Sequence, residues 1–185
     1  MKRLLIRLCV LLLAGIAHAA GPVPSDSIYQ LTVPLTDQDG HTAPLAARRG
    51  TPQIVSMFYS SCTMVCPMII DTMKATRHAA GEPAHLGLLA VSFDPARDDV
   101  AALRRYAAGH KLDLRWWTLA RTAPQGTRTL AALLGVQYRR LPDGDFNHSS
   151  ELLLLDAEGR IVARSTVIGR TDPQFVAAVR KLAGG

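Results

Sequence analysis

The stretch QIVSMFYSSCTMVCP, residues 53–67, decides the fold. Its first six residues are mostly apolar or β-branched, a composition typical of a buried central strand. The chain then runs directly to Cys62 and Cys66, and Pro67 is well placed for the first turn of a helix. The stretch therefore predicts a buried strand that ends at a cysteine pair beside a helix N-terminus.

Strands and helices are expected to alternate on either side of this stretch. Besides residues 53–58, the expected strands are 28–35, 41–45, 86–93, 115–119, 136–139, 151–155 and 160–167. The expected helices are one from about residue 67, one from a cap at Asp98 or Asp99 to about residue 108, one at 124–134 that Gly135 ends, and one at 172–182. This order predicts an α/β domain with a mixed sheet, helices on both faces and an N-terminal β-hairpin.

The first twenty residues have the pattern of a secretory signal peptide. Basic residues precede an apolar run at 8–17, and the small residues Ala17 and Ala19, on either side of His18, form a candidate cleavage site. The run is too short to span a bilayer comfortably, so we expect cleavage and a soluble periplasmic protein. The alternative is an uncleaved segment that anchors the protein to the membrane, facing the periplasm. Residues 21–27 are expected to form a flexible leader, and residues 28–185 a single domain.

The composition excludes several classes of function. Removing the signal takes away three of the 21 basic residues and none of the 15 acidic ones, which leaves a net charge of +3. The sequence has no run of basic residues and no basic stretch interleaved with aromatic residues, so nucleic acid is not an expected partner. The sequence has no Gly-rich phosphate loop, no Gly-x-Ser-x-Gly elbow and no His-Glu-x-x-His helix, so no small-molecule substrate is expected. We expect a monomer.

The cysteine pair supports two kinds of chemistry. Cys9 lies in the signal, so the mature chain holds only Cys62 and Cys66, which in an exported compartment can cycle between thiol and disulfide. The neighbouring helix N-terminus favours thiolates, and two thiolates form a soft donor set that copper(I) prefers. His148 is the candidate third ligand, because it lies in a polar loop at 141–150 just before a buried strand. In a thioredoxin-like sheet, the corresponding position faces the cysteine loop.

Other functions are compatible with the same residues. A thiol–disulfide oxidoreductase would use one cysteine for attack and the other for resolution, but such proteins usually place a Pro opposite their cysteines, where this chain has Asn147 to Ser150. A zinc site of two cysteines, one histidine and water is a further alternative. A structural disulfide that closes so short a loop would add little to the free energy of unfolding. The Pro-x-x-x-Thr-x-x-Cys setting of a thiol peroxidase is missing around Cys62.

From residue 31 to about residue 182 the sequence resembles the SCO/SenC family of copper-binding, thioredoxin-like proteins. The markers of the resemblance, in order, are LTDQDG at 35–40, FYSSCTMVCP at 58–67, VSFDPARD at 91–98, NHS at 147–149 and LDAEG at 155–159. The resemblance implies a thioredoxin-like fold and copper bound by Cys62, Cys66 and His148. It also implies a role as a metallochaperone, rather than an enzyme, that helps assemble a copper centre of cytochrome c oxidase. A copper-receiving oxidase subunit is then the expected partner, and the alternative role is to keep the cysteines of such a partner reduced.

The chain departs from the family pattern beside each part of the site. Thr63 and Met64 stand where the family usually has Pro-Asp, and Asn147 where it usually has Asp. The loss of two carboxylates is expected to favour copper(I) over copper(II). Met64, between the cysteines, is a candidate auxiliary ligand because thioether sulfur is also soft.

Several other residue types are expected to be structural. We expect Met57, Met68 and Met73 in the core, one of Trp116 and Trp117 buried, and Asp94 and Asp98 as turn and cap residues. The remaining histidines are expected to lack ligand partners, and Arg139 and Arg140 to be either solvated or available to steer an acidic partner. These histidines are His41, His78, His85 and His110.

Overall fold

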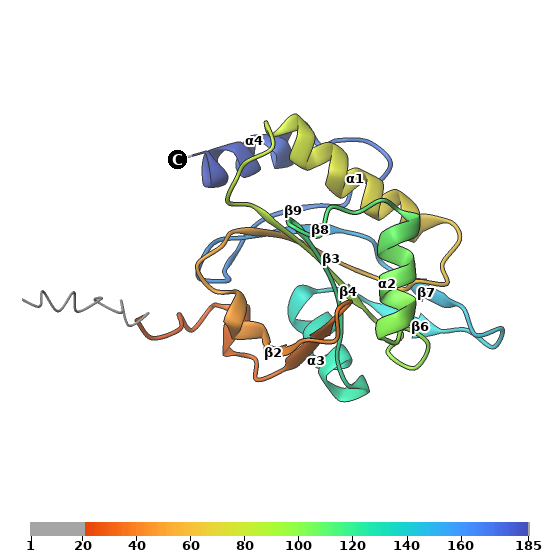
Figure 1. The fold of residues 1–185 in the computed structure, drawn as a ribbon. Coiled ribbons are helices and arrows are strands. Elements are labelled where there is room, and N and C mark those ends of the chain that lie inside the picture. Colours follow the sequence, from red (N-terminus) through yellow and green to blue (C-terminus); the bar gives the residue numbers. More distant parts are fainter. Residues whose placement is uncertain (1–20, 185) are drawn as a thin grey trace, which may run out of the picture.

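In the computed structural model, which describes residues 21–184, a seven-stranded mixed sheet forms the middle layer (Figure 1). The expected signal at 1–20 lies outside the described residues. Among those residues, no helix is both long and apolar enough to cross a membrane. The elements, in order, are η1 (Ile28–Gln30), β1 (Pro34–Asp37), β2 (Thr42–Pro44), η2 (Leu45–Arg48), β3 (Gln53–Phe58), α1 (Val65–Ala79), β4 (Gly87–Ser92), α2 (Val100–Gly109), β5 (Trp117–Arg121), α3 (Pro124–Leu134), β6 (Tyr138–Arg140), β7 (Phe146–His148), β8 (Leu152–Leu155), β9 (Ile161–Ser165) and α4 (Pro173–Ala183).

The sheet has a parallel centre and antiparallel edges. Its strand order is β2-β1-β5-β4-β3-β8-β9, and β3, β4 and β5 are parallel. β1 pairs antiparallel with β5, and β8 pairs antiparallel with β3. Every residue of β3 and of β8 is buried, as expected for strands covered on both faces. The expected α/β fold with a mixed sheet is confirmed.

Helices cover both faces of the sheet. Figure 1 shows α1 and α4 side by side on one face and α3 on the other. α2 lies beside α1, since Lys74 Nζ donates to the carbonyl of His110 at 2.8 Å. α3 begins at Pro124 and ends at Gly135, whose φ of +78° is the left-handed conformation that favours glycine. Both limits agree with the sequence prediction.

Three local predictions need correction. Residues 28–30 form a short 3₁₀ helix rather than the first half of a strand, because the Ser27 side chain caps them by accepting from the N–H of Tyr29. The polar loop at 141–150 contains a strand, β7, which pairs antiparallel with β6 in a separate two-stranded sheet. Met68 is 46% exposed rather than part of the core.

The two adjacent tryptophans differ in burial, as expected from strand alternation. Trp117 is buried in β5, whereas Trp116 is partly exposed and carries the guanidinium of Arg77 4.4 Å above its ring. Met57 and Met73 are buried, as expected. The tryptophans therefore serve packing at the sheet rather than a recognition patch.

The topology places three loops at one edge of the sheet. β3 and β4 are parallel, so the segments that follow them, which contain Cys62 and Asp98, leave the same edge. β8 is antiparallel to β3, with Val55 opposite Leu153, so β8 begins where β3 ends. The β6–β7 hairpin, which leads into β8, therefore arrives beside the cysteine loop.

Candidate metal centre

The two cysteines lie where β3 gives way to α1. Cys62 is 8% exposed in the connecting loop, and Cys66 is fully buried as the second residue of the helix. The N-cap residue, Met64, provides no side-chain hydrogen bond to the helix. Instead, the Cys66 N–H donates to the Cys62 sulfur at 3.3 Å. The Cys62 sulfur thus takes the place of a capping oxygen at the positive end of α1.

The two thiols differ in acidity. Burial tends to raise the pKa of Cys62, but hydrogen bonds from the backbone N–H groups of Cys66 and Met64 outweigh it and hold that pKa below its ordinary value. Burial raises the pKa of Cys66, and a negative charge on Cys62 raises it further. Cys62 is therefore the first of the pair to ionise, and Cys66 keeps its proton until a metal or a disulfide replaces it.

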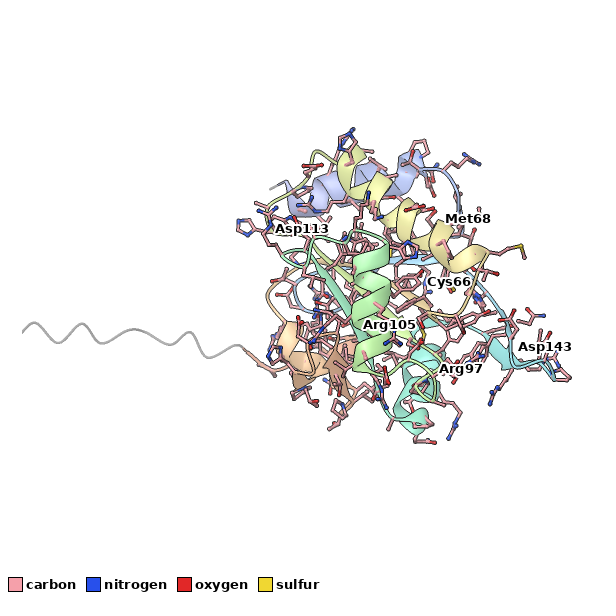
Figure 2. All side chains as sticks on the ribbon, turned by 45° about the vertical axis from the view of Figure 1, so that its right-hand side comes forward. Cys66, Met68, Arg97, Arg105, Asp113 and Asp143 are labelled. Carbon is pink, nitrogen blue, oxygen red and sulfur yellow. The ribbon has the colours of Figure 1, made fainter. Side chains whose placement is uncertain are left out.

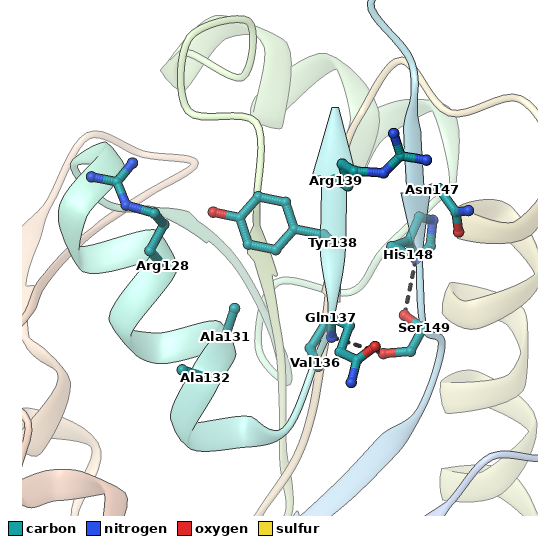
Figure 3. A pocket seen from close by; sticks show the side chains of 10 residues that line it. All are labelled: Arg128, Ala131, Ala132, Val136, Gln137, Tyr138, Arg139, Asn147, His148 and Ser149. Atoms are coloured by element: carbon teal, nitrogen blue, oxygen red, sulfur yellow. Dashed lines mark hydrogen bonds between the residues drawn. The ribbon is translucent and has the colours of Figure 1, made fainter. Parts of the chain in front are cut away.

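His148 ends β7 and turns its ring toward the cysteine loop. Its Nδ1 lies 3.0 Å from the carbonyl oxygen of Ser149, which accepts hydrogen bonds only (Figure 3). Nδ1 must therefore carry the proton in the neutral ring, which leaves the lone pair on Nε2. Such a hydrogen bond to a backbone carbonyl is the usual means of fixing the tautomer of a metal-binding histidine.

The structure brings the three predicted ligands together. One ligand atom each from Cys62, Cys66 and His148, two sulfurs and an imidazole nitrogen, lie within 4.8 Å of one another. Both cysteines are free thiols. The group combines two soft sulfur donors with one borderline nitrogen donor, a set that suits copper(I) or zinc and not magnesium or calcium.

An aromatic cluster supports the imidazole. The ring centroid of His148 lies 4.8 Å from that of Phe93, which follows β4, and 6.0 Å from that of Tyr59, which follows β3. Phe146, two residues before His148 on β7, packs its ring 5.1 Å from Tyr59 and 5.2 Å from Phe93. Rings from the segments after β3 and β4 therefore contact the histidine, and Phe146 packs against both of these rings, which limits the movement of the imidazole.

Two polar contacts fasten the β6–β7 hairpin to the rest of the domain. The Tyr59 hydroxyl donates to the Asp145 carboxylate, and Arg97 donates to the carbonyl of Gly144 at 2.6 Å. The Arg97 guanidinium also lies 5.7 Å from the Phe146 ring centroid and pairs with Asp94. Figure 2 shows the hairpin, with Asp143 at its tip, extending from the domain near Cys66. Sequence analysis missed these contacts, which join residues far apart in the chain.

The buried Asp98 carboxylate holds the cysteine loop in place through hydrogen bonds. It is fully buried and accepts hydrogen bonds from the N–H of Ser60 at 3.0 Å, from the Ser60 hydroxyl and from the Ser92 hydroxyl at 2.5 Å. The helix cap at α2 is instead Asp99, whose carboxylate accepts from the N–H of Ala102. Of the two predicted caps, Asp99 is therefore confirmed and Asp98 is not, because Asp98 ties the end of β3 to the end of β4.

The methionines beside the site are turned to solvent. Met64 is 79% exposed and Met68, one turn further along α1, is 46% exposed. Cys66, which lies between them in the sequence, is fully buried. Met64 is a surface residue, and its role as an auxiliary copper ligand stays a prediction.

A second group of possible ligands corrects the expectation for His41. Its ring, Asp37 and Asp39 bring ligand atoms within 4.8 Å of one another. Asp39 and His41 are exposed, and the Asp37 carboxylate already accepts the N–H groups of both. These contacts are those of a polar β-turn between β1 and β2.

Several solved structures have the same fold. The copper-bound ScoI of Bradyrhizobium japonicum is 24% identical, with 82% of this chain and 96% of that chain covered and a TM-score of 0.68. A SCO1/SenC family lipoprotein of Bacillus anthracis is 20% identical over 83% and 94% of the two chains, with a TM-score of 0.74. BsSco, described as a member of the Sco family of cytochrome c oxidase assembly proteins, is 18% identical over 82% and 91%, with a TM-score of 0.67.

Sequence comparison identifies the family. No curated protein sequence matches the chain. The family model for SCO1/SenC, however, matches residues 26–184, nearly the whole chain. The three fold neighbours named above are described as Sco or SCO1/SenC proteins, and the residues at 62, 66 and 148 meet at one edge of the sheet. The chain therefore belongs to the SCO1/SenC family.

Proposed function

We propose that this protein is a metallochaperone that binds one copper ion through Cys62, Cys66 and His148 and passes it to another protein. The observation that carries the proposal is the approach of two cysteine sulfurs and one imidazole nitrogen to within 4.8 Å at an edge of the sheet. Copper is the cargo, so the site must hold it firmly and still release it.

The chemistry of the site suits copper(I). Two thiolates and a neutral imidazole make a three-coordinate soft donor set, which leaves room for an incoming ligand. Transfer then proceeds by ligand exchange, in which each new bond from the recipient replaces one bond to the chaperone and the oxidation state of copper does not change. Thr63, Met64 and Asn147 provide no carboxylate beside the site, which further favours copper(I) over copper(II).

The recipient we propose is a subunit of a cytochrome oxidase. Support comes from family membership and from BsSco, which is described as belonging to a family of cytochrome c oxidase assembly proteins. The ScoI of Bradyrhizobium japonicum has been solved with copper bound. We further propose that residues 1–20 direct export to the periplasm and are then removed, and that residues 28–185 act as a single domain.

Anaerobic copper(I) titration of the reduced protein, in competition with a chromophoric chelator, tests the proposal. We expect one copper per protein and loss of this binding in Cys62→Ser, Cys66→Ser and His148→Ala. His41→Ala is the matched control, because His41 is exposed in a turn remote in sequence from the site. Unchanged binding in His148→Ala would exclude the three-ligand site. Zinc in protein purified without added metal would instead favour a zinc protein.

A thiol–disulfide oxidoreductase is the second candidate. It is favoured by the lowered pKa of Cys62 next to a buried second thiol, an arrangement suited to attack followed by resolution. Rapid reaction of the reduced protein with model disulfides, at a rate that copper does not alter, would favour this function over copper transfer.

A further inference from the structure

A groove lies between α3 and the β6–β7 hairpin, directly beside His148 (Figure 3). Its volume is about 950 Å³, and it is defined here as the α3–β6 groove. Small or apolar residues line its inner part, namely Ala131, Ala132 and Val136. Because His148 is also a lining residue, anything bound in the groove lies next to one of the proposed copper ligands.

The rim of the α3–β6 groove is positively charged. Arg128 of α3 and Arg139 of β6 both line it and are exposed, and no acidic residue is among the lining residues. Within residues 21–184 neither arginine has a carboxylate within 4.0 Å, and Arg128 donates only to the amide oxygen of Gln125. The two guanidinium groups lack acidic partners, so each is available to attract a carboxylate to the groove.

The edge of β6 that faces away from β7 offers backbone hydrogen-bonding groups. The N–H of Ser149 donates to the carbonyl of Gln137, and the N–H of Leu141 donates to that of Asp145. Antiparallel pairing alternates, so Arg139 shares hydrogen bonds with β7, whereas the backbone groups of Tyr138 and Arg140 point away from it. An extended peptide can add to such an edge as a further strand.

Resting on the copper transfer proposed above, we propose that the α3–β6 groove docks an acidic, extended segment of the copper-receiving protein. The segment pairs with the free edge of β6, and its carboxylates meet Arg128 and Arg139. Docking there brings a donor atom of the recipient to the His148 side of the site. That donor forms a bond to copper(I) as the bond from His148 breaks, and copper is neither oxidised nor reduced.

Two peptides of equal length test the docking step without metal. Both lack Cys, His and Met and carry a fluorophore, and one is rich in Glu and Asp whereas the other is rich in Lys. Fluorescence anisotropy with the metal-free full-length protein should show binding of the acidic peptide only. The double variant Arg128→Glu with Arg139→Glu should weaken that binding about tenfold or more at low salt, and added salt should reduce the difference.

A matched control separates the groove from net charge. Lys111→Glu with Lys181→Glu makes the same change in charge at exposed residues outside the groove, and it should leave peptide affinity within about twofold of the parent. The copper(I) stoichiometry of both double variants should equal that of the parent protein. Loss of copper binding in the parent would contradict the proposed function, whereas retained copper binding without acidic-peptide binding would overturn only the docking proposal.

Three further results would overturn the proposal. Equal binding of the Lys-rich peptide would show that charge complementarity does not select the partner. Binding of phosphatidylglycerol vesicles, lost in the groove variant while peptide binding persists, would identify a membrane surface as the occupant. Self-association in sedimentation velocity that the groove variant abolishes would identify a second copy of this chain.

Discussion

The cysteine side and the histidine side of the site are built in different ways. Cys62 lies in the loop after a fully buried central strand, Cys66 is the second residue of α1, and Asp98 fixes the loop by accepting from the Ser60 N–H. His148 lies on a two-stranded hairpin outside the main sheet. A few contacts hold that hairpin, chiefly those from Tyr59 to Asp145 and from Arg97 to Gly144.

The difference suggests that the cysteines and the histidine have separate roles in metal exchange. The sulfur donors are pre-organised by the core, so they can hold copper without rearrangement of the domain. The imidazole is supported by loops and aromatic packing, so its bond to copper can be broken at the cost of a few local contacts. Changes on the cysteine side should therefore alter folding stability, whereas changes on the hairpin side should alter copper affinity alone.

The largest effect is expected from Asp98→Asn, on the cysteine side. The buried carboxylate accepts three kinds of hydrogen bond, from the Ser60 N–H and from the hydroxyls of Ser60 and Ser92. Its replacement should lower the free energy of unfolding by about 2–3 kcal/mol, because an amide cannot accept from all of them. Urea denaturation of the reduced protein measures this change.

Asp71→Asn is the control for Asp98→Asn. Asp71 is exposed, and among the described residues it forms an ion pair with Lys74 alone, on the surface of α1, so its loss should cost less than about 1 kcal/mol. Equal destabilisation by the two substitutions would show that Asp98 does not support the cysteine loop in the way described.

A smaller effect is expected from Tyr59→Phe, at the contact between the cysteine loop and the hairpin. The substitution removes the hydroxyl that donates to Asp145 and also contacts the Cys62 sulfur, and it leaves the aromatic packing in place. We expect copper(I) affinity to fall about tenfold, by analogy with the loss of outer contacts at other metal sites. Chelator competition measures the affinity, and thermal unfolding should show little change.

Tyr138→Phe is the matched control on the same hairpin. The Tyr138 ring stacks on Phe93, but within residues 21–184 its hydroxyl makes no hydrogen bond, so this variant should bind copper(I) like the parent protein. A similar loss of affinity in both variants would point to ring packing rather than the Tyr59 hydroxyl as the support of the hairpin.

The next effect is a difference in thiol reactivity with pH. A lowered pKa means that Cys62 is already thiolate at a pH where an ordinary thiol is protonated, whereas Cys66, with a raised pKa, stays protonated. In the metal-free reduced protein, iodoacetamide should therefore modify Cys62 first, and faster than a model thiol peptide below pH 8.5. Peptide mapping by mass spectrometry identifies the site, and preferential alkylation of Cys66 would contradict the assignment.

The smallest effect is expected from Met64→Leu. Because Met64 is largely exposed, we expect copper(I) affinity to stay within about twofold of the parent. X-ray absorption at the copper edge should show the same sulfur contribution in both proteins. A loss of one sulfur scatterer in the variant would identify Met64 as an auxiliary ligand.

The sequence alone predicted the elements that depend on local signals. The apolar run at 53–58, Pro67 at the start of α1 and Gly135 at the end of α3 each mark an element through its own residue types. Placing His148 near the cysteines required a nonlocal fact, the antiparallel pairing of β8 with β3, which came from analogy with thioredoxin-like sheets.

The supports of the site could not be predicted in the same way. Asp98 and Asp99 are adjacent acids before a helix, and only the meeting of β3 and β4 decides which of them is buried. The short strand β7 contains Asn147 and His148, which give no apolar alternation. The link from Tyr59 to Asp145 joins residues 86 positions apart, so no local pattern reveals it.

X-ray absorption spectroscopy of the copper(I)-loaded reduced protein tests the central claim most directly. The three ligands within 4.8 Å predict a copper environment of two sulfur atoms and one imidazole nitrogen. The spectrum of His148→Ala should retain both sulfurs and lose the imidazole contribution. A parent spectrum with sulfur scatterers only, or one that His148→Ala leaves unchanged, would contradict a copper site shared between the cysteine loop and the hairpin.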